Sequence, residues 1–165
     1  MRFAFIQIMS KKFKIREIKP ESVYNDVLLA KFINHIMQRG KKFLAGKIVY
    51  RAFDIIKKDN KENPLDIFKK ALDKIGPSVE VRPRRVGGAT YQVPVDVKGD
   101  RKMGLAMRWL IETTRKKKGK TMDEKLAHEI IAASKGEGDA VKKRINIEKM
   151  AAANRSFAYL AKSKK

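Results

Sequence analysis

The sequence predicts a mainly α single domain of six helices, with a two-stranded β-hairpin protruding between helices three and four. Apolar residues recur at helical spacing over most of the 165 residues, whereas residues 79–97 alternate with period two. No repeat or long linker divides the chain. We therefore expect a basic N-terminal extension at residues 1–20, a helical domain at 21–160 carrying the hairpin at 79–97, and a basic tail at 161–165.

The first three helices follow from apolar stripes and from the residues that end them. The first stripe ends at Gly40, and the second ends in a polar stretch at residues 57–63. Asn63 and Pro64 form a cap signal that opens the third helix, which Gly76 and Pro77 close. The residues expected inward are Leu29, Phe32, Ile33, Ile36 and Met37, then Ala45, Ile48, Val49, Ala52, Phe53 and Ile56, then Leu65, Phe68, Leu72 and Ile75.

Residues 79–97 read as a hairpin because two alternating runs flank Gly87 and Gly88, which accept the positive φ angles of a tight turn. Pro83 and Pro94 fit a free two-stranded ribbon, which has only edge strands and needs support at its base. Three arginines precede the turn: Arg82, Arg84 and Arg85. They predict a finger inserted into a polyanion. The alternative is an exposed hairpin that its charge keeps soluble.

Three further helices follow the hairpin. We expect Asp100 to cap the fourth, the box from Thr121 to Glu124 to open the fifth, and Asp139 to cap a sixth that runs towards Tyr159. The residues expected inward are Ala106, Trp109, Leu110 and Thr113, then Met122, Leu126, Ile130 and Ala133, then Ala140, Val141, Ile145, Met150 and Ala151. The basic block at residues 115–118 predicts phosphate contacts, although one or two cations there would also suit the helix dipole.

Charge limits the kinds of partner. Forty Lys and Arg face 18 Asp and Glu, which gives a net charge of +22 and predicts binding to phosphate polymers. The absence of cysteine excludes disulfides and thiolate metal sites. No apolar run approaches the roughly 20 residues of a transmembrane helix, so a membrane is not an expected partner. The apolar residues 3–9 are too short for a signal peptide and lack a cleavage site, and either Met1 or Met9 could be the true start.

A search for catalytic or metal-binding residues gives none, and no cofactor is expected. His35 and His128 fall on different helices, and the pair His128–Glu129 lacks the second histidine that a zinc-protease helix would carry at Ala132. The residue types therefore predict binding and not catalysis. A DNA-binding regulator using helices four and five as a helix-turn-helix is the first alternative. An RNA-processing enzyme is the second.

Four stretches resemble the family of small-subunit ribosomal protein seven, in its bacterial or organellar form. They are VLLAKFINHIMQRGKK (27–42), RPRRVGGATYQVPVDV (82–97), GLAMRWLIETTRKK (104–117) and AVKKRINIEKMAAANRSFAYL (140–160). They occur in the family's order and span nearly all of residues 20–160.

The resemblance implies a structural, non-enzymatic constituent of the small ribosomal subunit that binds and organises the 3′ major domain of its RNA, the head. It also implies that the hairpin reaches towards the exit-site tRNA and the messenger exit path, beside head proteins that include the eleventh. A homo-oligomer is not expected. The ribosome would lie in a bacterial cytoplasm or in an organelle.

Carried over to this sequence, the resemblance assigns the hairpin finger on the tRNA and messenger side to Arg82, Arg84, Arg85, Gly87, Gly88 and Tyr91. It assigns ribosomal RNA binding to Lys11, Lys12, Lys14, Arg16, Lys41, Lys42, Arg101, Lys102, Arg108, Arg115, Lys116, Lys117, Lys118, Lys142, Lys143 and Arg144. The chain departs from the family pattern in the apolar residues 3–9 and at Phe43, which replaces a small polar residue and which we expect to be buried.

Overall fold

The computed structural model describes residues 17–59 and 62–162. It contains the predicted six helices and the hairpin, followed by two short helical turns. The elements are α1 (Val27–Ile36), α2 (Lys42–Asp59), α3 (Pro64–Ile75), β1 (Val79–Val86), β2 (Ala89–Asp96), α4 (Gly99–Lys116), α5 (Met122–Lys135), α6 (Asp139–Ala153), the 3-10 turn η1 (Arg155–Ala158) and α7 (Tyr159–Lys162). The predictions for Lys11, Lys12, Lys14, Arg16 and residues 163–165 lie outside the described residues.

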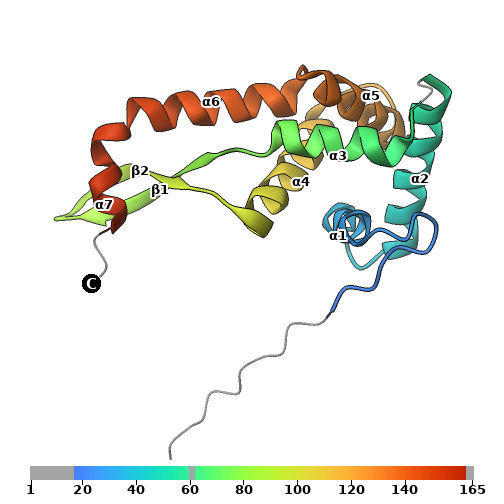
Figure 1. The fold of residues 1–165 in the computed structure, drawn as a ribbon, viewed down its shortest axis with the longest axis horizontal. Coiled ribbons are helices and arrows are strands. Elements are labelled where there is room, and N and C mark those ends of the chain that lie inside the picture. The colour runs from blue at the N-terminus through green and yellow to red at the C-terminus, as the bar shows by residue number, and fades with distance from the viewer. Residues whose placement is uncertain (1–16, 60–61, 163–165) are drawn as a thin grey trace, which may run out of the picture.

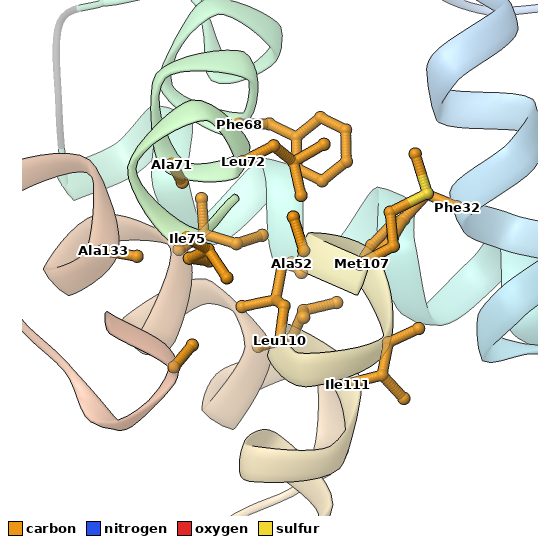
Figure 2. Packing of buried hydrophobic residues seen from close by; sticks show 14 of the residues in the cluster. Phe32, Ala52, Phe68, Ala71, Leu72, Ile75, Met107, Leu110, Ile111 and Ala133 are labelled. Carbon is orange, nitrogen blue, oxygen red and sulfur yellow. The ribbon is translucent and has the colours of Figure 1, made fainter. Parts of the chain in front are cut away.

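Helix α5 lies at the centre of the helical body and packs against α2, α3, α4 and α6. The fully buried rings of Phe32, Phe53 and Phe68 join α1, α2 and α3, with centroid separations of 4.8 Å from Phe32 to Phe68 and 5.8 Å from Phe53 to Phe68. Figure 2 shows aliphatic side chains of α3 and α4, including Leu72 and Leu110, meeting around this centre. The apolar stripes read from the sequence therefore form one core.

The predicted cap of α3 is confirmed: the side chain of Asn63 accepts from the backbone N–H of Leu65 at 3.1 Å. The other three capping predictions were wrong in detail. Helix α4 starts one residue before Asp100, which instead pairs with Lys31 at 3.1 Å, and the Thr121 side chain makes no cap hydrogen bond. The α6 cap position is Gly138, because buried Glu129 of α5 already accepts from the N–H of Ala140 at 2.8 Å.

Helix α6 departs most from the expectation. It ends at Ala153, and Ile145 and Met150, expected inward, are 37% and 49% exposed. Figure 1 shows the reason: α6 leaves the helical body and runs alongside the hairpin, so the core covers only its first turns. In α4 the predicted inward residues Ala106, Trp109 and Leu110 are buried, and only the last position differs, because Thr114 is buried where Thr113 was expected.

The hairpin has the predicted turn, with Gly87 and Gly88 at φ angles of 56° and 91° between the paired residues Val86 and Ala89. It is not a free ribbon. Helix α6 packs against β1, and η1 and α7 pack against β2. Val93 is only 1% exposed as a result. The hairpin and the C-terminal helical turns thus form an arm at the end of the molecule opposite α2 (Figure 1).

Candidate nucleic-acid interface

The base of the hairpin is tied to α4 through one buried carboxylate. Glu80, 6% exposed, accepts two hydrogen bonds from Arg101, at 2.9 Å from Nε and 2.7 Å from Nη2, and a third from Arg82. Burial raises the pKa of Glu80, but these two guanidinium groups outweigh it and leave that pKa below its ordinary value. Arg82 and Arg101 therefore join the hairpin to α4. About half of each of the two side chains is still exposed to solvent.

The other finger residues divide between the arm and solvent. Arg84 donates to the backbone carbonyl of Leu160, and the Tyr91 ring lies 5.1 Å from that of Phe157, so both join the hairpin to the C-terminal turns. Arg85, paired in register with Thr90 beside the turn, is exposed and makes no ion pair with any residue that the structure describes. Of the three predicted arginines, Arg85 is the one whose guanidinium is left to solvent at the tip.

A second basic surface joins α1, the α1–α2 loop and α4. His35, Arg108, Arg115 and Lys116 line a hollow of about 470 Å³, and Arg115 also borders a neighbouring hollow of about 410 Å³ with Arg39 and Lys41. Below, the α1–α4 face denotes Arg39, Lys41, Arg108, Arg115 and Lys116.

Backbone contacts position two members of the α1–α4 face. Arg115 donates to the last carbonyl of α1, that of Ile36, at 2.9 Å, and Arg108 donates to that of Gly104 at 3.2 Å. Burial, followed by the charge of Arg108, lowers the pKa of His35, so this histidine stays neutral near pH 7. Lys116 pairs with Glu112 at 2.9 Å, and this carboxylate also lines the first hollow, so the face offers four cations without an ion pair among the described residues, namely Arg39, Lys41, Arg108 and Arg115, to phosphates.

The basic residues of α6 are partly neutralised. Lys143 pairs with Glu112 at 2.5 Å and lies 5.7 Å from the Trp109 ring, while Lys142 is exposed. Lys143 and then Lys116 lower the pKa of Glu112 to about 2. Arg144 is 3.9 Å from Glu148, and its buried Nε has no hydrogen-bond partner among the described residues. Lys142 lies 3.6 Å from Asp139, but its side chain is 75% exposed, so it is the most accessible cation of this cluster.

Lys117 has turned inward. Its ammonium binds the fully buried Glu129 and lies 3.4 Å from Asp139, so it joins α4, α5 and α6. Burial lowers the pKa of Lys117, but Glu129 more than offsets this and raises it. Lys41, Lys42 and Lys118 are exposed, while Lys102 is half-buried with its stem against Gly76.

Sequence reasoning missed Arg39 and misjudged Phe43. Arg39 has a φ of 51°, a left-handed conformation beside Gly40, and the predicted helix stop at that glycine was the available signal. Phe43 is 78% exposed, so the expectation that it is buried was wrong: α2 begins at Lys42, and its first turn extends past the core. The Nζ of Lys47 lies 4.7 Å from the centre of its ring.

The first alternative, a DNA-binding helix-turn-helix, fits this geometry poorly. A recognition helix must be accessible, yet α5 packs against four helices and its exposed residues are His128 and Lys135. Within residues 17–59 and 62–162 no three His, Cys, Asp or Glu side chains gather in a way that could hold a metal ion. Over the same residues, no helix is both long and apolar enough to span a bilayer.

Comparison with known proteins agrees with this description. The sequence matches the family described as Ribosomal protein S7p/S5e over residues 8–155. Each of three curated relatives is named small ribosomal subunit protein uS7. The Thermotoga petrophila protein is 52% identical over 149 residues, 90% of this chain and 96% of the relative. The proteins of Thermotoga neapolitana and an Anaeromyxobacter species are 55% and 54% identical over 144 residues, 87% of this chain and 93% and 92% of the relatives.

The family match covers the helical body, the hairpin and all of α6. The predicted resemblance is thereby confirmed, and the chain belongs to the ribosomal protein S7p/S5e family.

Proposed function

We propose that this protein is a structural constituent of the small ribosomal subunit, in the cytoplasm of a bacterium, and that it binds and organises the 3′ major domain of the subunit's RNA. The observation that carries the proposal is the family match over residues 8–155, with relatives above 50% identity named as small-subunit proteins. The protein contributes no chemical step. It holds RNA segments that would otherwise repel one another.

The α1–α4 face is the principal RNA anchor in this proposal. Arg39 and Lys41 lie in the α1–α2 loop and the other three cations lie on α4, where backbone contacts hold Arg108 and Arg115 in place, so two neighbouring segments present their charges to an RNA backbone. The exposed Lys42, Lys118 and Lys142 extend the array. With roughly five to eight phosphates engaged, the logarithm of the affinity should fall with log salt at a slope on the order of five to seven.

The hairpin has a separate role in the proposal. Its tip lies at the end of the arm, away from the helical body (Figure 1), and exposes Arg85. We assign it to the exit-site tRNA and messenger side, next to neighbouring head proteins such as the eleventh. Arg82 and Arg101 belong to its support, because Glu80 holds both.

The test is binding of the purified protein to the 3′ major domain of small-subunit RNA and to duplex DNA of equal length, at several salt concentrations. We expect tight, RNA-selective binding that survives moderate salt. A variant with Arg108, Arg115 and Lys116 changed to Ala should lose most of that affinity, and one with Arg82, Arg84 and Arg85 changed to Ala should lose little. Equal binding to both polymers, lost together as salt rises, would contradict the proposal.

A further inference from the structure

A groove of about 910 Å³ lies between the segment that precedes α1 and the first turns of α2. Ile18, Pro20 and Val23 line one side, and Phe43, Gly46 and Tyr50 line the other. The last three are spaced i, i+3 and i+7 along α2, so they share one helix face. The α1–α4 face ends at Lys41, next to this groove in the sequence.

Several exposed apolar side chains lie together in this groove. Phe43 is 78% exposed, Val23 65% and Ile18 39%. A contiguous exposed patch of this kind marks a contact site. The ammonium of Lys47 sits over the Phe43 ring at 4.7 Å, which orders the ring and leaves its other face for a partner. Gly46 contributes no side chain, and a Cβ there would meet only the Tyr50 ring, at 3.7 Å.

The charges around the groove favour an anionic partner. Lys19, Lys42 and Lys47 line it and are all exposed. Two carboxylates also line it. Glu17 is exposed, but Glu21 is 8% exposed and its oxygens accept from the N–H groups of Val23 and Tyr24, both at 2.8 Å, and from the Tyr50 hydroxyl. Glu21 is thus satisfied internally, and the free groups at the rim are mainly ammonium.

We propose that an unpaired nucleotide of RNA binds in this groove, with its base stacked on the open face of Phe43 and its flanking phosphates at Lys42 and Lys47. An aromatic ring between lysines is the arrangement by which proteins hold single-stranded RNA, since every base has a π-face. The inference rests on the proposed RNA-binding function and adds a base contact to a surface otherwise built for the backbone.

The test compares variants for binding to the 3′ major domain RNA. Phe43→Ala should weaken binding about 5- to 150-fold, which corresponds to the loss of one base stacked on an aromatic ring. Phe43→Tyr keeps the ring and should bind within about twofold of the unmodified protein. Tyr159→Ala is the matched control, because Tyr159 is an aromatic residue of similar exposure, 69%, in α7 and borders neither the groove nor the α1–α4 face. Phe43 and Tyr159 are both solvent-exposed, so folding is not at stake.

Two further measurements separate stacking from charge. The salt slope should be unchanged in Phe43→Ala, which removes no cation, and should fall by about 0.7–0.9 in Lys47→Ala. Ultraviolet cross-linking followed by mass spectrometry should join an RNA nucleotide to Phe43.

Equal affinities for Phe43→Ala and the unmodified protein, or equal losses in the Ala and Tyr variants, would overturn the stacking proposal and assign the groove to a protein segment or to residues 3–9 of this chain. RNA-selective binding by the unmodified protein in that case would leave the proposed function standing. Failure of the unmodified protein to prefer RNA would overturn both.

Discussion

Glu129 connects three helices through one side chain. It is fully buried, binds the ammonium of Lys117 at the end of α4, and accepts from the N–H of Ala140 in the first turn of α6. Gly138 leaves room for it, because a Cβ at that position would lie 2.9 Å from the carboxylate oxygen. A carboxylate with this little exposure is tolerated only when both oxygens are engaged.

Replacing Glu129 with Ala should lower the free energy of unfolding by about 1–3 kcal/mol, because it leaves the buried N–H of Ala140 without a partner and leaves the Lys117 ammonium with Asp139 alone, at 3.4 Å. Urea unfolding followed by circular dichroism measures the loss. Glu137→Ala, an exposed carboxylate in the next loop, is the control and should stay within about 0.5 kcal/mol. Similar losses in the two variants would mean that the pairing of Glu129 is not what stabilises this junction.

Glu112 should contribute a pH-dependent part of the stability. Lys143 and Lys116 lower its pKa to about 2 from an ordinary 4.5, so its ion pairs stabilise the fold above about pH 4.5 and are lost as pH falls towards 2. The side chain is 44% exposed, which limits the effect to less than about 1 kcal/mol. The difference in unfolding free energy between the unmodified protein and Glu112→Gln should therefore be present at pH 7 and vanish near pH 2. A difference that is constant over this range would contradict the pairing.

Two glycines near the start of α2 differ in backbone conformation: Gly40 precedes the helix and Gly46 lies within it. Gly40 has a φ of 71°, which only glycine adopts without strain, whereas Gly46 lies inside the helix with room for a methyl group. Gly46→Ala should raise the free energy of unfolding by about 0.5–1 kcal/mol, because alanine favours the helix and restricts the unfolded chain. Gly40→Ala should lower it by about 1–2 kcal/mol through left-handed strain. Chemical denaturation of both variants measures these opposite signs, and a shift in the same direction for both would contradict the assignment.

The arm is an element whose order depends on contacts outside the main core. The Tyr91 ring meets that of Phe157 at 5.1 Å, and the residues of this contact are separate from the core cluster of the helical body. Phe157→Ala should therefore free the hairpin tip and the C-terminal turns while leaving the body intact. Hydrogen exchange should speed up over residues 82–92 and 154–162 and stay unchanged in α2 and α5. Faster exchange throughout the protein would show that the arm and body unfold together.

Across the whole molecule, the sequence predicted what repeats along the chain and missed what depends on distant partners. The stripes of α1 to α3 and the glycine turn of the hairpin are local patterns, so they were recoverable. Asp139 was predicted to cap α6, but the carboxylate that accepts from the first turn of α6 is that of Glu129, on another helix. No local sequence pattern shows this contact. Lys117 and Arg82 looked like free cations for the same reason, since their carboxylate partners are visible only in the folded chain. The exposure of Phe43 depends on where α2 leaves the core, which no local pattern reports.

The net charge of the molecule should make its thermal stability depend on salt concentration. A charge of +22 on 165 residues makes the folded protein repel itself in the absence of RNA, and this repulsion is long-ranged at low ionic strength, where the screening length is ~30 Å at 0.01 M against ~8 Å at 0.15 M. Local ion pairs are weakened by the same screening, but each exposed pair contributes little. Added sodium chloride should therefore raise the midpoint of thermal unfolding.

The control for this effect is a variant in which exposed Lys58 and Lys149 are changed to Glu, which removes two units of positive charge for each residue. Its unfolding midpoint should be higher than that of the unmodified protein at about 0.01 M salt, and the two should converge near 0.15 M, because screening then removes the repulsion that the variant lacks. Calorimetry at the two concentrations measures both values. A midpoint that falls as salt is added would contradict this prediction. It would mean that attraction within the ion pairs outweighs the repulsion among the excess positive charges in the free protein.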